Sequence, residues 1–321
     1  MIEVIKPGLL TTFQDAGRPG FAHFGIGRSG AFDAPARRIA NALCGNPDDA
    51  CALEITLSGP RLRMREAACI AVTGAPIPFR IDGIEQPMWA PVPVPAGATI
   101  DLGTMSSGCR SYLAVRGGFD LAPVLGSRSV DVNAKLGPHA GRALGAGDVL
   151  PIAAADVRED ARARPTWWID PRPWFDQDAQ APLRLLPGNH LDALTESSRE
   201  SLFSETFRVR ADSNRTGLRL DGPPLELARP IEMISEGCVP GLLQLPPSGQ
   251  PIAFGPECPV SGGYPRIGQV AVVDMPRLAQ LRPGDAVRFT PCTFEGALHA
   301  LRERERMLDT LTVNIAARLA P

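Results

Sequence analysis

Arginine beside paired glycines is the clearest chemical feature of this sequence. It occurs at Arg116-Gly117-Gly118, and Arg128 follows in a second glycine-containing loop at 125–129. Glycine pairs let a backbone approach a ligand closely or adopt positive φ. A guanidinium can grip a carboxylate or a phosphate through two parallel hydrogen bonds. The two loops therefore predict a site for a small anion, although each loop alone also fits an ordinary tight turn between strands.

Two further groups of polar loops contain residues that could orient an amide. One runs from Thr11 to Asp33, and the other lies in the C-terminal half, from Ile234 to Pro265. Glutamine next to a proline-fixed turn offers a donor and an acceptor in a held position. Because such loops occur in both halves, we expect them to line a shared cleft. The candidate binding residues are Gln14, Asp15, Arg18, Ser29, Gly117, Gly118, Ser127, Gln244, Gln250, Gly262 and Gly263.

The sequence lacks the motifs that several common types of catalytic or cofactor site require. Lysine occurs only at Lys6 and Lys135, so the sequence has neither the Gly-Lys-Ser/Thr run of a phosphate-binding loop nor the lysine of a biotin-carrier turn. The run Gly25–Gly30 matches G-x-G-x-x-G, but a turn-rich loop precedes it where a dinucleotide site needs a buried strand. The four histidines are scattered, which predicts no dedicated metal site. No G-x-S-x-G elbow occurs, although a serine triad assembled in space stays an alternative.

The composition predicts a soluble protein with an ordinary core. The chain has 321 residues, of which 44% are hydrophobic, and its net charge of −2 gives no field that would attract nucleic acid or an anionic membrane. The seven cysteines include no Cys-x-x-Cys pair, so we expect free, mostly buried thiols in a reducing compartment. The N-terminus shows no signal-peptide pattern, and no apolar run approaches the length of a membrane span. We therefore predict a cytoplasmic location.

Short apolar runs separated by glycine and proline predict a mainly β protein. The spacing of these runs indicates a barrel or a sandwich rather than a doubly wound sheet. A helix is predicted over Ala34–Leu43, with Asp33 as its N-cap and Gly45 after its end. Another is predicted from about Phe294 to Leu308 because apolar residues recur along one side of it. The predicted strands include 2–5, 52–57, 68–73 and 111–115 in the first half, and 232–235, 242–245 and 270–274 in the second.

The length and an internal repeat predict two related lobes. Three short motifs recur in the same order, and one of them, Gly147-Asp148, returns as Gly284-Asp285. Between the halves lies a stretch rich in Ala, Asp, Arg and Pro that contains three tryptophans, which we expect to pack against a lobe because exposed indoles are unfavourable. We predict an N-terminal lobe over residues 1–155, a linker over 156–182, and a C-terminal lobe with a C-terminal helix over 183–321.

Longer motifs make the sequence resemble one particular protein family. The opening run Lys6–Arg18, which reads KPGLLTTFQDAGR, is followed in order by SGAFD at 29–33, RGGF at 116–119, LGSRS at 125–129 and GGYP at 262–265. These motifs resemble the biotin-dependent carboxyltransferase family, which includes allophanate-hydrolase subunit 2, KipA-like proteins and the C subunit of bacterial 5-oxoprolinase. The resemblance extends over nearly the whole chain.

The resemblance implies two cyclophilin-like β-barrel lobes with a few short helices. It also implies a subunit of an ATP-dependent amidohydrolase that opens 5-oxoproline to glutamate and is active only in a complex. ATP would be the co-substrate, and the partners would be a KipI-like B subunit and a LamB/YcsF-like A subunit. Two alternatives stay open: a carboxyltransferase that uses biotin supplied in trans, and a non-enzymatic KipA-like antagonist of a KipI-type kinase inhibitor.

On this hypothesis, four residues are candidates for the chemistry: Arg116, Arg128, Glu236 and Tyr264. The two arginines could hold the substrate carboxylate or a phosphoryl group. Glu236 could act as a general acid or base if burial raises its pKa. Tyr264 could orient the amide together with Gln244 and Gln250. The sequence departs from the family pattern at 25–30, 212–217 and 258–265, which leaves another lactam or amide open as the substrate.

Overall fold

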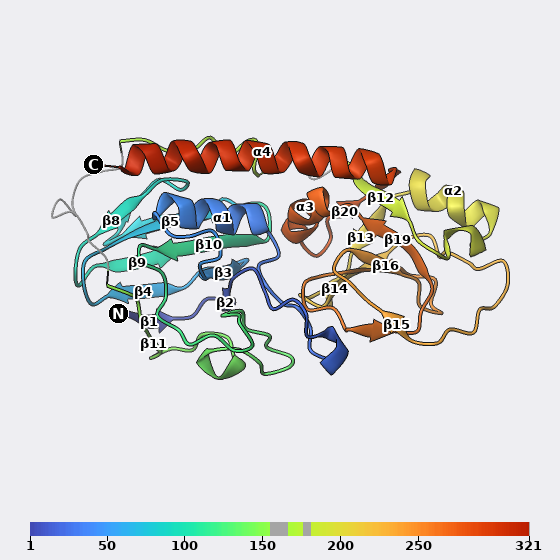
Figure 1. The fold of residues 1–321 in the computed structure, drawn as a ribbon, viewed down its shortest axis with the longest axis horizontal. Helices are drawn as coiled ribbons and strands as arrows, with labels where there is room; N and C mark the ends of the chain where they lie inside the picture. Colours follow the sequence, from blue (N-terminus) through green and yellow to red (C-terminus); the bar gives the residue numbers. More distant parts are fainter. Residues whose placement is uncertain (155–165, 176–180, 321) are drawn as a thin grey trace. The chain divides into compact units, whose positions relative to one another are not determined.

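The computed structural model describes residues 1–154, 166–175 and 181–320. The chain divides into two compact units, which are described separately (Figure 1). The first comprises Met1–Arg18, Ser29–Gln177 and Leu308–Pro321; the second comprises Pro19–Arg28 and Asp178–Met307. These units differ from the predicted lobes at three places: 19–28 belong to the second unit, 308–321 belong to the first, and 166–175 of the predicted linker also belong to the first. The linker predicted over 156–182 lies partly outside the described residues.

Two antiparallel sheets form the first unit. Its strands are β1 (Ile2–Lys6), β2 (Leu10–Gln14), β3 (Ala52–Thr56), β4 (Arg61–Met64), β5 (Ala68–Gly74), β6 (Phe79–Ile81), β7 (Ile84–Glu85), β8 (Val92–Val94), β9 (Thr99–Leu102), β10 (Arg110–Val115) and β11 (Val149–Leu150). The larger sheet has the order β11-β1-β4-β9-β6-β7, and the smaller has the order β2-β3-β10-β5-β8 (Figure 1).

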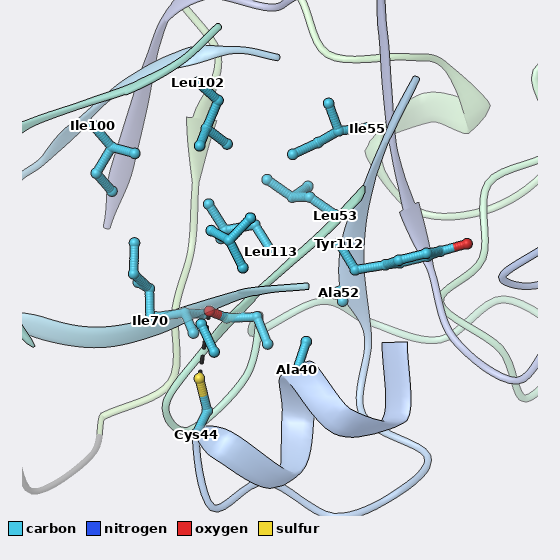
Figure 2. Packing of buried hydrophobic residues seen from close by; sticks show 14 of the residues in the cluster. Ala40, Cys44, Ala52, Leu53, Ile55, Ile70, Ile100, Leu102, Tyr112 and Leu113 are labelled. Carbon is cyan, nitrogen blue, oxygen red and sulfur yellow. Dashed lines mark hydrogen bonds between the residues drawn. The ribbon is translucent and has the colours of Figure 1, made fainter. Parts of the chain in front are cut away.

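The core of the first unit is formed by apolar side chains of both sheets. Figure 2 shows Leu53, Ile70 and Leu113 of the smaller sheet beside Ile100 and Leu102 of the larger one. Strand β4 alternates exposed and buried residues, as expected for a strand with one face in water. Strands β5 and β10 are buried throughout because helix α1 (Ala34–Leu43) covers their second face. The core therefore fixes β2, β3 and β10, which lead to the polar residues described below.

Helix α1 confirms its sequence prediction at both ends. The Asp33 carboxylate accepts the Ala36 N–H at 3.1 Å, which satisfies one of the first-turn donors. Gly45, just beyond the end of the helix, has φ of 72°, the left-handed conformation that glycine adopts without strain. The Thr73 hydroxyl on β5 donates to the Ala36 carbonyl at 2.7 Å and so ties the helix to the sheet.

The second unit contains a nearly closed barrel. Its strands are β12 (Leu183–Pro187), β13 (Phe207–Val209), β14 (Gly217–Asp221), β16 (Leu242–Gln244), β17 (Ile252–Phe254), β19 (Arg266–Val270), β20 (Ala286–Val287) and β21 (Phe289–Pro291). Their order is β20-β13-β14-β17-β16-β19-β12-β21, and the two edge strands are separated by Arg288 alone. Strands β15 (Glu236–Gly237) and β18 (Ser261–Gly262) form a separate ribbon. The mainly β fold predicted from the sequence is confirmed.

One of the three further helices is longer than predicted. Helices α2 (Glu196–Ser204) and α3 (Met275–Gln280) are short, but α4 runs from Phe294 to Leu319 over 26 residues. It continues past the predicted end at Leu308 because Leu308, Leu311, Ile315 and Leu319 recur at helical spacing and pack on the core of the first unit. Within the described residues, no helix combines the length and apolar character needed to cross a membrane.

Two predicted strands of the second half are wrong. Residues 232–235 form no strand, and the short β15 begins only at Glu236. The strand predicted over 270–274 ends at Val270, where β19 ends, and a 3-10 turn over Val272–Asp274 follows. The apolar residues of 270–273 continue into a 3-10 turn, and only Met233 and Ile234 are apolar in 232–235, so hydrophobicity alone did not identify these segments correctly.

The repeated Gly-Asp motif forms the same turn in both units. In the first, Gly147 N–H donates to Val4 O at 2.8 Å and Val4 N–H donates to Asp148 O at 2.8 Å. In the second, the Gly284 N–H donates to the Val209 carbonyl at 2.7 Å, and the Val209 N–H donates to the Asp285 carbonyl at 3.0 Å. Each aspartate carboxylate also accepts the N–H three residues earlier, of Gly145 at 2.6 Å and Arg282 at 2.8 Å. The repeat seen in the sequence is therefore structural at this turn.

Two of the three tryptophans of the predicted linker pack as expected. Trp174 is 7% exposed within the core cluster of the first unit, and Trp167 packs against that cluster. Trp168 is 69% exposed, which contradicts the expectation for this residue. The segment that carries them, 166–175, is therefore partly anchored to the first unit.

Candidate functional site

Asp15 lies at the centre of a buried polar group just after β2. Its carboxylate accepts the Gly17 N–H at 2.8 Å, the Ser127 hydroxyl at 2.6 Å, the Ser129 hydroxyl and the backbone N–H of Arg128. The Asp15 N–H donates in turn to Ser129 Oγ at 2.9 Å. These bonds hold the 125–129 loop against the turn after β2. Because the carboxylate is largely occupied, it positions its neighbours rather than offering itself to a ligand.

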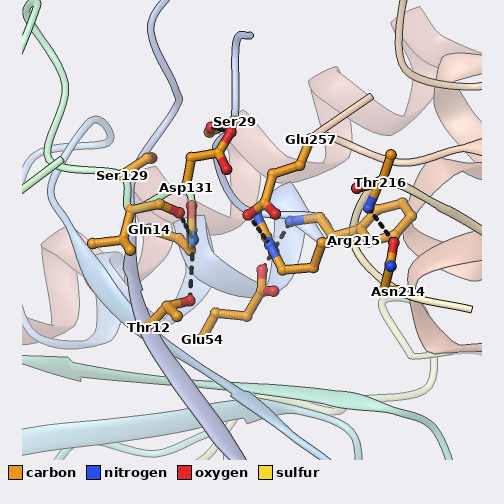
Figure 3. Close-up of polar contacts among 12 residues, drawn as sticks. Thr12, Gln14, Ser29, Glu54, Ser129, Asp131, Asn214, Arg215, Thr216 and Glu257 are labelled. Atoms are coloured by element: carbon orange, nitrogen blue, oxygen red, sulfur yellow. Dashed lines mark hydrogen bonds and ion pairs between the residues drawn. The ribbon is translucent and has the colours of Figure 1, made fainter. Parts of the chain in front are cut away.

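Arg18, Ser29 and Asp131 extend this group. Arg18 is 1% exposed, and its guanidinium donates to Ser29 Oγ at 3.1 Å and to the Ser129 carbonyl. The Ser29 hydroxyl donates to Asp131 Oδ2 at 3.3 Å, and Figure 3 shows these two side chains. Ser29 has φ of 54°, a conformation that is uncommon for serine and concentrates at functional positions. The Ser29 hydroxyl thus connects the buried Arg18 guanidinium to the buried Asp131 carboxylate.

Gly30 explains how the Ser29 loop approaches Asp15. A Cβ added at Gly30 would lie 3.0 Å from Gly17 N and 3.1 Å from Ala16 C, and φ at this position is +99°. The next residue, Ala31, donates its N–H to the Asp15 carbonyl at 3.0 Å. A side chain at Gly30 would therefore separate the loop from the turn that holds Arg18.

Glu54 anchors the other end of the Ser29 loop and was not predicted as a functional residue. Its Oε2 accepts the Phe32 N–H at 2.9 Å and the Tyr112 hydroxyl at 2.7 Å, and that hydroxyl accepts the Asp33 N–H at 2.8 Å. Arg110 lies 3.5 Å from Glu54 Oε1 and stacks on the Phe32 ring at 4.6 Å. Burial, together with the nearby Glu54 carboxylate, raises the pKa of Tyr112 well above its usual value, so it stays a neutral donor.

Arg116 and its glycines lie against a different set of neighbours. The Arg116 N–H donates to the Cys69 carbonyl at 2.8 Å, and the Gly117 N–H donates to Asn46 Oδ1 at 2.9 Å. Gly118 has φ of 80° and donates to the Val115 carbonyl, which closes a tight turn. Among the described residues, Arg116 Nε is buried without a hydrogen-bond partner. This half-buried guanidinium is therefore available to an anion.

Arg128 takes part in the Asp15 group through its backbone. Its N–H donates to Asp15, while its Nε donates to the Leu121 carbonyl at 2.8 Å. The contacts of Arg116 and Arg128 thus involve different residues, and the binding of a carboxylate or a phosphoryl group by either arginine stays a prediction.

The ribbon of the second unit carries most of the remaining candidates. Glu236 pairs with Gly262 across it and forms an ion pair with Arg266. The Glu236 side chain is 46% exposed, so the burial that its predicted acid or base role assumed is not observed. Gly263 lies beyond Gly262, and an added Cβ there would be 3.5 Å from Ser235 Oγ. The ribbon therefore presents its polar residues to solvent.

Gln244 lies beneath the ribbon. It is 2% exposed, and its Nε2 lies 3.5 Å from the Tyr264 carbonyl and 3.6 Å from Cys238 Sγ. A Cβ at Gly262 would come within 2.8 Å of Gln244 Nε2, so a side chain at this position would displace the Gln244 amide. The structure thus places the Gln244 amide near the backbone of Tyr264, and Tyr264 itself is 45% exposed.

Gln250 has a structural role in its turn. Its Oε1 accepts the Gly222 N–H at 3.0 Å, and its Nε2 donates to the Gly222 carbonyl at 3.0 Å. Both ends of the amide are therefore engaged by one backbone residue, and a contact of Gln250 with substrate stays a prediction.

A buried ion pair in the second unit was also missed. Arg215 Nε donates to Glu257 Oε1 at 2.6 Å, and their side chains are 4% and 3% exposed (Figure 3). Arg215 lies in the 212–217 segment and Glu257 directly precedes Cys258, so both lie in or beside segments that depart from the family pattern. The sequence did contain a signal that could have identified Glu54. It is a charged residue inside the strand Ala52–Thr56, where the other residues are apolar or threonine.

The described residues offer little for a metal or a lysine-based mechanism. In the part of the chain that the structure describes, no three His, Cys, Asp or Glu residues gather as a metal site. Lys6 and Lys135 are both exposed, so neither has the buried environment that activates a lysine nucleophile. Gly25 follows a 3-10 turn over Ala22–Phe24, not a strand, so the dinucleotide motif lacks its structural context.

Comparison with known families defines the class of this protein. The model of the family described as the carboxyltransferase domain, subdomain A and B, matches residues 24–291. The chain belongs to this family, and the resemblance found in the sequence is confirmed. It is 37% identical over 313 residues to the C subunit of 5-oxoprolinase from Escherichia coli (strain K12) and 34% identical to that from Haemophilus influenzae; each alignment covers 97% of this chain and 97% of the relative.

Other relatives contain this chain's counterpart as a part of a longer protein. The urea amidolyase of Saccharomyces cerevisiae is 31% identical over 95% of this chain, which corresponds to 17% of that protein. The solved K. lactis urea amidolyase superimposes with a TM-score of 0.84 at 28% identity, over 98% of this chain and 20% of the other. The solved protein TTHA0988 gives a TM-score of 0.79 at 35% identity, over 90% of this chain and 55% of the other.

Proposed function

We propose that this chain is the C subunit of an ATP-dependent 5-oxoprolinase, which opens the lactam of 5-oxoproline to glutamate. The observation that carries the proposal is the end-to-end match with two bacterial 5-oxoprolinase C subunits, which covers 97% of each partner in the alignment. The urea amidolyase match covers only 17% of that protein, so the complete carboxylation system is much larger than this chain.

Lactam opening requires an activated carbonyl, because an amide is a poor electrophile. Transfer of the γ-phosphoryl group of ATP to the amide oxygen would activate the ring carbon. Water then adds to that carbon and the C–N bond breaks, with a proton passing to the leaving nitrogen, which gives an acyl phosphate. A second water hydrolyses the acyl phosphate to glutamate and phosphate. Arg116 is our first candidate to hold the substrate carboxylate, since its half-buried guanidinium retains an unbonded Nε. Arg128 is second, because its Nε already donates to Leu121.

Each candidate residue of the second unit has its own proposed role. Glu236, which is exposed and paired with Arg266, would act as a general acid or base. Tyr264 and Gln244 would orient the amide, with Gly262 and Gly263 allowing close approach of the backbone. Gln250 would support its turn.

We assign nucleotide binding chiefly to the partner subunits of the proposed complex. This chain has no Gly-Lys-Ser/Thr run, and its two lysines are exposed. The proposed partners are a KipI-like B subunit and a LamB/YcsF-like A subunit, with activity in the complex and a cytoplasmic location.

The proposal is tested by reconstitution. Mixing the three subunits should give ATP hydrolysis that depends on 5-oxoproline and releases glutamate, and omission of this chain should abolish it. Tight binding of a KipI-like partner without turnover would instead support a KipA-like regulator.

Arg116 provides a residue-level test of the same reaction. Arg116→Ala should lower kcat/KM for 5-oxoproline by about 10- to 100-fold through loss of a charge-assisted hydrogen bond. The matched control is Arg80→Ala, on the exposed face of β6, which should retain the wild-type rate. Full activity of Arg116→Ala would remove this residue from the chemistry.

A carboxyltransferase is the second candidate function. It is favoured by the TM-score of 0.84 to the urea amidolyase over 98% of this chain. It would require biotin from another protein, because this chain has no carrier lysine. Inhibition of the reconstituted reaction by avidin would favour it, whereas activity unaffected by avidin supports the 5-oxoprolinase.

A further inference from the structure

Asn46 holds the two peptide groups on either side of Arg116. Its Nδ2 donates to the Val115 carbonyl at 2.8 Å, and its Oδ1 accepts the Gly117 N–H at 2.9 Å. That carbonyl belongs to the peptide group before Arg116, and that N–H belongs to the peptide group after it. One side-chain amide therefore fixes the backbone on both sides of the arginine that is our first candidate for holding the substrate carboxylate.

The backbone of this turn needs support because two glycines follow the arginine. Gly117 and Gly118 have φ of 83° and 80°, so the chain turns sharply directly after β10. Glycine loses more backbone freedom on folding than any other residue, so such a turn is costly to order. The Gly118 N–H donates to the Val115 carbonyl at 2.9 Å, and the Asn46 amide adds two further bonds across the turn.

Asn46 is itself anchored to the end of helix α1. Its backbone N–H donates to the Asn41 carbonyl at 2.9 Å, and its Nδ2 also donates to Asn41 Oδ1 at 3.0 Å. Asn41 has no exposed surface, and its own Nδ2 donates to the Ala50 carbonyl at 2.8 Å. Both amide hydrogens of Asn46 are thus used, and turning the amide over would bring its oxygen against two acceptors. A continuous set of hydrogen bonds therefore runs from the helix to the Arg116 turn.

The Arg116 side chain depends on this backbone for its position. The residue is half-buried and Gly117 is exposed, so solvent reaches the turn. Among the described residues, Arg116 Nε has no hydrogen-bond partner, so this atom does not anchor the guanidinium. A bidentate contact with a carboxylate needs the planar guanidinium in a defined orientation. An error of about 1 Å in such a contact can cost about 100-fold in rate, even when the mutated residue touches no substrate.

We propose that Asn46 is a positioning residue that holds Arg116 in the orientation in which it binds the carboxylate of the lactam. This inference rests on the proposed lactam-opening function and adds a residue to its site. Because both ends of the Asn46 amide are engaged, the residue acts on the substrate only through Arg116. Removing Asn46 should therefore matter only while the Arg116 guanidinium is present.

The test is a double-mutant cycle on the reconstituted complex, measured as ATP hydrolysis that depends on 5-oxoproline. Asn46→Ala should lower kcat/KM for 5-oxoproline by about 10-fold. The loss should appear in KM rather than in kcat, because the carboxylate is held alike before and during the reaction. With Arg116→Ala already present, Asn46→Ala should change kcat/KM by less than about 2-fold, because the two residues then no longer act together.

Asn46→Ala is expected to fold, because the backbone groups that it frees keep other partners. The Val115 carbonyl still accepts the Gly118 N–H, and the exposed Gly117 can bond to water. Thermal unfolding of each variant checks folding. Asn46→Ser, which also removes the amide but keeps a polar group, replaces Asn46→Ala in the cycle if the alanine variant is unfolded.

The matched control is Asp82→Ala in the turn between β6 and β7 of the same unit. It removes a side-chain acceptor of a backbone group, since Asp82 Oδ1 accepts the Thr99 N–H at 2.8 Å. This variant should keep the wild-type kcat and KM, both alone and together with Arg116→Ala as compared with Arg116→Ala alone.

An equal loss from Asn46→Ala in both backgrounds would overturn the inference, because Asn46 would then act independently of Arg116. Unchanged activity of Asn46→Ala overturns it as well, and so does full activity of Arg116→Ala, since no guanidinium would then need positioning. In each of these cases, ATP hydrolysis with 5-oxoproline by the wild-type complex leaves the proposed function standing. A wild-type complex without this activity rejects the proposed function and the inference together.

Discussion

Asp15 is the residue on which the buried polar group of the first unit depends most. Asp15→Ala would leave the hydroxyls of Ser127 and Ser129 and two backbone N–H groups without their common acceptor. We expect it to lower the free energy of unfolding by about 3–5 kcal/mol, as for other buried charged groups removed from their partners. Urea unfolding measures this difference.

The control for Asp15 is an exposed carboxylate of the same unit. Asp101 lies 3.9 Å from Arg61, and both side chains are about half exposed. Asp101→Ala should change stability by less than about 1 kcal/mol, because exposed ion pairs contribute little. Similar losses for the two variants would show that the Asp15 group contributes no more than a surface pair.

Residue-level prediction from the sequence succeeded where a polar residue stood in a recognisable loop. Gln14, Asp15, Arg18, Ser29 and Ser127 were all selected, and the structure brings them into one group. Glu54 was missed because its partners come from residues 22 and 58 positions away in the chain. A single sequence gives no measure of such pairings, and the roles assigned to the selected residues stay predictions.

At the scale of elements, the second half of α4 stabilises the first unit. Leu308 and Ile315 are 0% and 2% exposed and belong to its core cluster. Ile315→Ala should cost about 2–4 kcal/mol through lost burial and the cavity left behind. Val313 lies two residues earlier and is 67% exposed, so Val313→Ala should cost less than about 0.5 kcal/mol. Equal losses in urea unfolding would contradict this packing.

The Gly-Asp turn of the first unit gives a pH-dependent prediction. The Arg142 guanidinium, assisted by the Gly145 N–H and His139, holds the pKa of the Asp148 carboxyl well below its usual range. Such a group stabilises the folded state above its unfolded pKa of about 3.9, and this contribution is lost as the pH falls toward the folded value. Asp148→Asn should therefore reduce stability at pH 7 and progressively less below pH 4. A constant difference in urea unfolding between pH 7 and pH 3 would sink this prediction.

Elements were predictable where local chemistry marked their ends. Helix α1 had a capping aspartate, a proline in its first turn and a glycine after its end, and its bounds are as predicted. Helix α2 has only Ser198 and Leu202 buried, so its apolar pattern is too sparse to identify it. The end of α4 was misplaced because the charged run 302–306 interrupts its apolar side before the core contacts resume.

At the scale of the whole molecule, the number of cysteine thiols that react with a reagent tests which cysteines are buried. Cys44, Cys51, Cys69, Cys109 and Cys258 are buried, and Cys238 and Cys292 are partly exposed. Burial raises the pKa of Cys258 to about 12, and it also raises that of Cys44, which further slows their reaction as thiolates. Ellman's reagent at pH 8 should therefore label at most two thiols rapidly, and all seven after denaturation. Rapid labelling of more than two would contradict the described packing.

The family and the mainly β class could be predicted because they rest on long motifs and on the spacing of short apolar runs. The bounds of the two units could not. Residues 19–28 and 308–321 each belong to a unit that is distant from them in the sequence, and such long-range assignments depend on packing rather than on local composition. That the loops of the two halves line one cleft stays a prediction.

The two edge strands of the nearly closed barrel in the second unit are connected by a single residue. Arg288 alone separates β20 from β21, the two outermost strands of an eight-stranded sheet. Proteolysis or a flexible insertion at this point would let the two edge strands move apart and make the unpaired backbone of each more accessible. Exposed margins of this kind recruit strands from neighbouring molecules. Such a nicked chain should therefore associate into dimers or larger aggregates by strand exchange while most of its internal pairing is preserved.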